Sequence, residues 1–262
     1  MHRIARLVLT LGLLAAAPRP GGAQPEARDL SAVADHTRHA VVFLRILDAF
    51  GVELGSGSGF FVDPEGVIVT NYHVIEPGSR VEAVLSNKRT LEVVGVLATD
   101  KANDLAVIKV DDGPFPALEL ADSSAVVPGQ RVVVLGNPLG LAGSLSEGIV
   151  SALRAGDELP GEHHMPLLQI TAAISPGSSG SPVMNLAGEV VGVAVLQANM
   201  GQNLNFAVPS TAVRELLGTI DAGVPPRPLG SVAGAGVWTY ARNLALSLLV
   251  FGAIWLGFRY LR

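Results

Sequence analysis

Short apolar segments of strand character, separated by turn residues, run along most of this chain and restrict its fold more than any other feature. They are rich in Val, Ile, Leu and Phe and are interrupted by turn sequences such as DPEG, EPGSR and SNKR, the pattern of β-strands joined by tight turns. Six segments lie before Pro114 and six after Val127: Val41–Leu47, Leu54–Val62, Val67–Asn71, Val81–Leu85, Thr90–Leu97, Leu105–Val110, Arg131–Leu135, Ser146–Ala152, Leu167–Thr171, Pro182–Met184, Val190–Leu196 and Leu204–Val208.

Two sets of about six short strands predict an all-β fold of two small antiparallel β-barrels. We place barrel one over residues 40–113 and barrel two over 128–210, within one domain of residues 40–221. No long amphipathic helix alternates with the strands, which argues against a doubly wound α/β fold. The abundant glycine, 30 of 262 residues, suits a chain with many tight turns.

After the second set of strands, the spacing of apolar residues predicts a C-terminal helix over Ser210–Ile220, with Ser210 as its N-cap. A linker rich in Pro and Gly follows over residues 222–236.

Both ends of the chain carry targeting signals. Residues 1–23 combine arginines, an apolar run of 11 residues and small residues at a cleavage site, as a secretory signal peptide does; an uncleaved anchor is the alternative. Residues 24–39 form a polar N-terminal segment. The uncharged run Leu244–Phe258 within residues 237–262 is flanked by aromatics and arginines and predicts a short transmembrane segment. A buried helix or a removable sorting tail are the other interpretations.

Composition excludes several classes of function. There is no cysteine, so disulfides, thiolate catalysis and cysteine-ligated metals are absent. The net charge of −5 without a basic run argues against binding nucleic acid. Adjacent His163 and His164 stand near two glutamates, but neighbouring loop histidines point in different directions. We therefore expect no metal and no cofactor, with a metal role for this pair as the alternative.

Three separated residues have the types needed for nucleophilic catalysis by serine. A serine hydroxyl needs an imidazole to take its proton, an acid to orient the imidazole, and backbone N–H groups to hold the oxyanion. His73 lies at the end of a strand in IVTNYHVI, Asp104 at the start of a strand in NDLAVIKV, and a serine cluster lies in SPGSSGSPV. Each alone is more often structural, but the order His, Asp, Ser across two β units is one that this chemistry uses.

These blocks, together with GSGSGFFVDPEG, LGNPLGLAGSLSEGIVSAL and LNFAVPS, resemble the trypsin-like serine proteases, most closely the bacterial HtrA (Deg) branch. The resemblance runs from about Val41 to Leu217. It implies a chymotrypsin-type pair of barrels and makes His73 the general base, Asp104 its orienting acid and Ser179 the nucleophile. It also implies that Gly177, Ser178 and Ser179 form the oxyanion hole, with the N–H groups of Gly177 and Ser179 as donors and Ser178 between them.

The resemblance implies a substrate pocket without charge. Its walls would come from the segment before the nucleophile and from a strand after it, so we expect small or medium apolar residues before the cut. The pocket residues are Thr171, Ala172, Ala173, Ile174, Val193, Ala194, Val195 and Leu196.

The chain departs from the family pattern at three points. The branch usually reads GNSGGP where this chain has GSSGSP, so Ser178 replaces an asparagine and Ser181 a glycine. Digestive relatives have an aspartate before the nucleophile, which pairs with the new N-terminus that zymogen cleavage creates. Ser178 has no charge to make that pair, so activation by N-terminal cleavage is not expected. The residues after Leu217 are read as linker and membrane segment, which leaves no place for a PDZ domain.

The sequence thus predicts a serine endopeptidase, secreted across the cytoplasmic membrane and tethered to it, that cuts unfolded or extended proteins in the periplasm or another extracytoplasmic space. A homo-oligomer is possible.

Because His73 must be neutral to accept a proton, activity should fall below about pH 6 to 7. The alternatives are an inactive or weakly active domain that binds peptides in envelope quality control, and acyl transfer to another substrate such as an ester.

Overall fold

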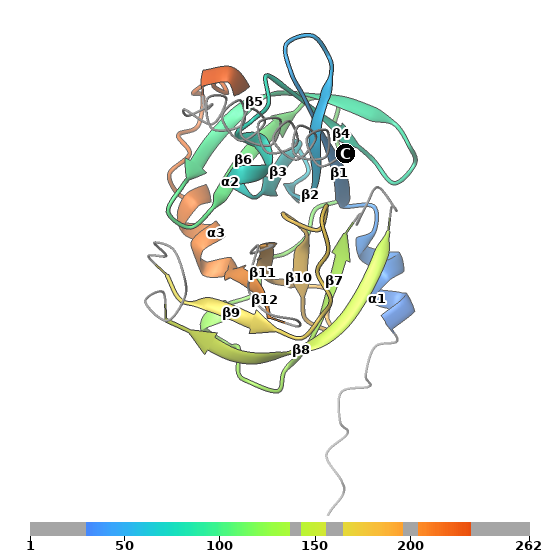
Figure 1. The fold of residues 1–262 in the computed structure, drawn as a ribbon, viewed down its shortest axis with the longest axis vertical. Coiled ribbons are helices and arrows are strands. Elements are labelled where there is room, and N and C mark those ends of the chain that lie inside the picture. The colour runs from blue at the N-terminus through green and yellow to red at the C-terminus, as the bar shows by residue number, and fades with distance from the viewer. Residues whose placement is uncertain (1–29, 137–142, 156–164, 196–203, 232–262) are drawn as a thin grey trace, which may run out of the picture.

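The structure is a computed structural model that describes residues 30–136, 143–155, 165–195 and 204–231 (Figure 1). Most of its elements are strands, and its helices are few and short. Barrel one contains β1 Val41–Leu47, β2 Glu53–Asp63, β3 Val67–Thr70, β4 Arg80–Val84, β5 Thr90–Asp100 and β6 Leu105–Val110. Barrel two contains β7 Arg131–Gly136, β8 Ser144–Arg154, β9 Leu167–Ile170, β10 Pro182–Met184, β11 Val190–Val195 and β12 Asn205–Pro209. The helices are α1 Leu30–Thr37, α2 Tyr72–Ile75 and α3 Ser210–Leu217, with 3₁₀ turns at Ser123–Ala125 and Leu229–Ser231.

Each set of six strands closes into an antiparallel barrel. The strand order is β1-β2-β3-β6-β5-β4 in the first and β10-β11-β12-β9-β8-β7 in the second. Closure leaves no strand edge unpaired. Two six-stranded barrels were predicted from the sequence, and that prediction is confirmed. The long strands β2, β5 and β8 each extend one to three residues beyond their predicted ends at one or both termini.

Apolar side chains form three buried clusters rather than one per barrel. One cluster fills barrel one and another fills barrel two. The third contains residues of both barrels, among them Phe60, Val107, Val133 and Phe206, together with Val213 of α3. Figure 1 shows the two barrels stacked, with α3 beside their junction. The shared cluster therefore fixes the two barrels against each other, which matters because the candidate site draws residues from both.

The predicted helix after barrel two is present as α3, which ends at Leu217 rather than at Ile220. The prediction of Ser210 as N-cap was wrong: Pro209 is the N-cap, and the Ser210 hydroxyl donates to the Ala121 carbonyl at 2.7 Å. The described part of the predicted Pro/Gly linker then returns to barrel one. Val96 and Arg227 exchange two backbone hydrogen bonds, each 2.8 Å long, and Leu229 is buried in the cluster inside barrel one. Residues 226–229 are thus packed structure, because Leu229 gains burial that a free linker would not provide.

Among the described residues, no helix is long and apolar enough to cross a membrane. The predicted signal peptide at 1–23 and transmembrane segment at 237–262 lie outside the described residues, as do His163, His164 and Leu196.

Candidate active site

His73 lies in α2, a single helical turn that follows β3. The sequence placed this histidine at a strand end, but β3 stops at Thr70 and the chain turns at once. Tyr72, Val74 and Ile75 are buried, whereas the His73 side chain is 45% exposed. Burial of its neighbours therefore anchors the turn and directs the imidazole toward the surface.

Asp104 holds this turn through both its carboxylate and its carbonyl group. The carboxylate accepts hydrogen bonds from His73 Nδ1 at 2.7 Å and from the His73 backbone N–H at 2.9 Å. The Asp104 carbonyl oxygen accepts from the Tyr72 N–H at 3.1 Å and from Asn71 Nδ2 at 2.9 Å. Since a carboxylate only accepts, the proton stands on His73 Nδ1, and Nε2 keeps the lone pair that a general base needs.

The backbone of Asp104 has φ +53°, in the left-handed region that few residues other than glycine adopt. Asparagine and aspartate tolerate this conformation better than most side chains. Asp104 therefore meets a local backbone requirement and also supplies the acceptor for His73.

A lysine side chain lies over the ring of Tyr72, the neighbour of His73. Lys101 Nζ lies 4.8 Å from the centre of the Tyr72 ring. A hydrogen bond with the Tyr72 side chain raises the pKa of Lys101, despite opposing desolvation. The ammonium group therefore lies within cation–π distance of the residue next to His73.

Ser179 belongs to barrel two, but its loop is bound to barrel one. The Ser179 carbonyl oxygen accepts from the Ser58 N–H at 2.8 Å, and Ser58 Oγ donates to the Gly177 carbonyl at 2.8 Å. Thr70 Oγ1, just before α2, donates to the Ser58 carbonyl at 2.7 Å. A short chain of hydrogen bonds thus connects the serine loop to the strand end that carries the His73 turn.

Gly180 allows this close approach. Its φ is +85°, and a Cβ atom there would lie 2.0 Å from the Ser58 carbonyl oxygen and 2.5 Å from Thr70 Oγ1. Only glycine satisfies both the conformation and the space.

The N–H groups of the serine loop divide into used and free donors. Ser178 donates to the Ser175 carbonyl, Gly180 to Ala194 and Ser181 to Ser178. Within the described part of the chain, the N–H groups of Gly177 and Ser179 have no hydrogen-bond acceptor. Two free donors on either side of Ser178 are the arrangement that an oxyanion hole requires, and they are the two N–H groups that the resemblance implies as its donors.

Ser181 is fully buried, and its hydroxyl has no hydrogen-bond partner among the described residues. Its Oγ lies where a Cβ on Gly136 would clash at 2.2 Å, so strand β7 accommodates the extra side chain only because it has glycine there.

Replacing Ser181 by alanine is expected to raise the free energy of unfolding by about 1 kcal/mol, since the change keeps the packing of Cβ and removes an unsatisfied buried hydroxyl. Urea unfolding followed by circular dichroism measures this. A loss of stability of similar size would show that the hydroxyl is hydrogen-bonded in solution.

The predicted pocket residues divide by accessibility. Ala172 and Ala194 pack in the interior of barrel two, and Val193 and Val195 in the cluster between the barrels. These four therefore contribute backbone rather than side chains to any pocket. Thr171, Ala173 and Ile174 remain at least partly accessible, and none is charged.

Ser58, Thr70 and Asn71 join the site, although sequence reasoning did not select them. All three are completely buried. Ser58 stands in the glycine-rich GSGSGF, and Thr70 and Asn71 stand three and two residues before His73. These positions were the signals by which the sequence could have identified them. In the described ranges, no group of three or more His, Asp or Glu side chains has the placement to hold a metal ion.

Comparison with known proteins gives consistent similarities. The profile of the trypsin-like peptidase domain matches residues 57–193. The putative serine protease HhoB of Synechocystis sp. is 38% identical over 159 residues, which are 60% of this chain and 38% of that protein. A probable periplasmic serine endoprotease, DegP-like, of Pseudomonas savastanoi pv. phaseolicola is 36% identical over 169 residues, 63% of this chain and 35% of that protein.

Among solved structures, the HtrA-type protease AlgW with a tripeptide superimposes with a TM-score of 0.67 at 26% identity, covering 73% of this chain and 63% of AlgW. The serine endoprotease from Yersinia pestis superimposes with a TM-score of 0.64 at 26% identity, covering 72% of this chain and 65% of that protease. The chain therefore spans little more than a third of these curated relatives and just under two thirds of these solved chains.

Proposed function

Because this chain belongs to the trypsin-like peptidase domain family, in its HtrA/Deg branch, we propose that it is a serine endopeptidase that cuts unfolded or extended proteins. The observation that carries the proposal is the pairing of Asp104 with His73 Nδ1, beside a serine loop that is tied to the same strand end through Ser58 and Thr70.

In the proposed reaction, Ser179 Oγ attacks the carbonyl carbon of the substrate while His73 Nε2 takes its proton. The Gly177 and Ser179 N–H groups stabilise the oxyanion of the tetrahedral intermediate. His73 then protonates the leaving amine, and the peptide C–N bond breaks to give an acyl-enzyme. Water, deprotonated by His73, hydrolyses this ester and restores Ser179.

Asp104 keeps the imidazole in the required tautomer and stabilises the imidazolium that forms at each step. Both of its carboxylate oxygens are bound to His73. Asp104 therefore fixes the position of the residue as well as its protonation.

We place this activity outside the cytoplasm. The two ends of the sequence support a secreted, C-terminally tethered protein, and the DegP-like relatives are named as periplasmic. The trypsin-like domain of residues 40–221 would be the proteolytic unit, with 222–236 linking it to a membrane segment at 237–262.

A fluorophosphonate probe, which reacts with activated serines, tests the proposal. Full-length protein in membranes should be labelled, and mass spectrometry should locate the adduct on Ser179. Absence of labelling together with tight binding of unfolded casein would instead identify a peptide-binding domain without catalysis. Labelling together with turnover of esters but not of casein would identify a different acyl transfer.

The uncharged pocket residues support a preference for small or medium apolar side chains before the cut. Among matched fluorogenic peptides, those with valine, alanine or leucine at that position should be cleaved at least about tenfold faster, in kcat/KM, than those with lysine or arginine, because a buried unpaired charge is costly. Equal rates for lysine and valine would contradict an uncharged pocket.

A further inference from the structure

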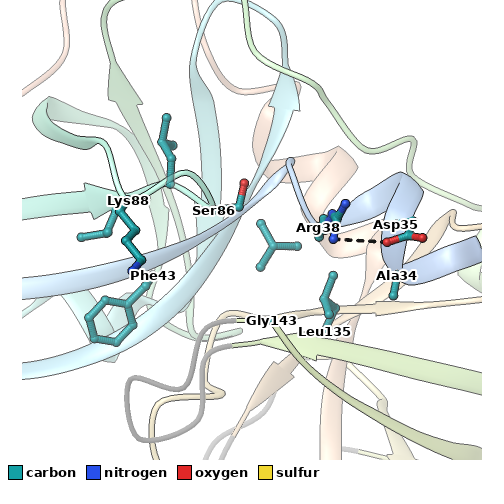
Figure 2. Close-up of a pocket in the computed structure, with 11 residues that line it drawn as sticks. Ala34, Asp35, Arg38, Phe43, Ser86, Lys88, Leu135 and Gly143 are labelled. Atoms are coloured by element: carbon teal, nitrogen blue, oxygen red, sulfur yellow. Dashed lines mark ion pairs between the residues drawn. The ribbon is translucent and has the colours of Figure 1, made fainter. Parts of the chain in front are cut away.

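A cavity of about 500 Å³ lies away from Ser179 and His73, where α1, β1, the β4–β5 turn and β7 meet (Figure 2). Its size falls in the range of ligand-binding pockets, which commonly form where two units meet. Its lining is mainly apolar and comes from both barrels: Val41, Phe43, Val84, Leu85 and Leu135. None of these residues has a part in the proposed mechanism.

Two cations line this cavity, Arg38 and Lys88. Arg38 forms an ion pair with Asp35 at 3.2 Å, a surface pair that contributes little and can rearrange. Lys88 has no ion pair with any described residue, and its side chain extends toward Phe43 (Figure 2). The cavity thus combines an apolar lining with an available positive charge.

The Lys88 backbone is held in an unusual conformation. Its φ is +67°, in the region that favours glycine. The turn fixes it there, since the Lys88 N–H donates to the Leu85 carbonyl at 2.8 Å and the Leu85 N–H donates to the Arg89 carbonyl at 2.9 Å. A lysine here costs conformational energy that glycine would avoid, and in return a positively charged side chain lines the cavity.

Hydrogen-bond acceptors complete the lining. Asp35 and Ser86 both border the cavity, and Ser86 Oγ lies 2.9 Å from His39 Nδ1. Backbone N–H groups of a peptide match these acceptors, whereas a hydrocarbon tail would desolvate them without compensation.

We propose that this cavity binds the C-terminal end of an apolar peptide, with its free carboxylate on Lys88 and its last side chains against Phe43 and Leu135. The carboxylate and the ammonium group form a charge-assisted contact, and the aliphatic side chains are removed from water.

The strands that form the cavity also position the serine loop. Phe43 of β1 pairs with Ser58 of β2, and Ser58 is hydrogen-bonded to Ser179 and Gly177. Leu135 of β7 precedes Gly136, which packs against Ser181. A bound peptide therefore contacts elements one strand away from the nucleophile.

Peptides ending in an apolar residue are also products of the proposed cleavage, and this link alone depends on the proposed function.

Isothermal titration calorimetry tests the site. The full chain, carrying Ser179→Ala so that no peptide is cut, is titrated with an N-acetylated pentapeptide that ends in valine with a free carboxylate. The same peptide with an amidated C-terminus should bind about tenfold more weakly, as should the free acid to protein that also carries Lys88→Gln, since each change removes one charged partner. Lys88→Arg, which keeps the charge, is the matched control and should retain binding.

Three results would overturn the proposal. They are binding of the amide as tight as that of the acid, an affinity that Lys88→Gln leaves unchanged, and competition by hexanoate as effective as that of the peptide, which would favour a free fatty acid. Circular dichroism and thermal unfolding establish that the Lys88 variants fold. The titration does not depend on turnover, whereas failure of the proposed function is recognised separately, by absence of fluorophosphonate labelling when Ser179 is intact.

Discussion

Replacement of Ser179 by alanine is expected to lower kcat on a peptide substrate by about 10⁶-fold and to abolish fluorophosphonate labelling, as loss of the nucleophile does in other triad proteases. The free energy of unfolding should change little, because the hydrogen bond from the Ser58 N–H to the Ser179 carbonyl oxygen does not involve the side chain and remains. Cleavage of casein and of a fluorogenic peptide, measured with equal amounts of parent and variant, checks this.

Ser175→Ala is the matched control. Ser175 lies in the same loop, and its carbonyl rather than its side chain is used, accepting from the Ser178 N–H at 2.9 Å. Labelling and turnover should survive this change. If Ser175→Ala abolished labelling and Ser179→Ala did not, the nucleophile would be misassigned within the loop.

Replacement of Asp104 by asparagine should lower kcat by about 10⁴-fold, the loss known for this change in other triad proteases. An asparagine NH₂ facing His73 Nδ1 would force the Nδ1 position to accept, so the proton would move to Nε2 and the base would be lost. KM should change much less than kcat, because substrate contacts are unaltered. Steady-state kinetics at neutral pH separates the two parameters.

Asp111→Asn provides the comparison for loss of one acidic charge. Asp111 is 73% exposed in its side chain and faces Lys109 at 3.6 Å, a surface pair that contributes little. The kcat of the Asp111→Asn variant should match that of the parent protein. If Asp104→Asn lowered kcat by less than about tenfold, Asp104 would act only in folding the turn and not in orienting the imidazole.

Much of the fold was predictable because most strands of this chain are short, rich in β-branched residues and separated by turn residues. The period of two and the turn sequences are local properties, so all twelve strands were located to within a few residues. The α2 turn was not, because the four residues Tyr72–Ile75 carry too weak a local preference to be distinguished from a strand end. The return of residues 226–229 to barrel one was also missed, since only contact with Gly95 and Val96 distinguishes that segment from a linker.

The sequence by itself provided the residues to which we assign the chemistry: one histidine and one aspartate at strand boundaries, and one serine in a loop of small residues. Tertiary structure alone decided how they are connected, because the hydrogen bonds that matter join residues 31 to 119 positions apart, and no local pattern encodes such pairings. It also decided that Val193 and Val195 face the core, and that Ser58 of one barrel holds the loop of the other. Long-range packing fixes these relations, since the shared apolar cluster determines how the two barrels meet.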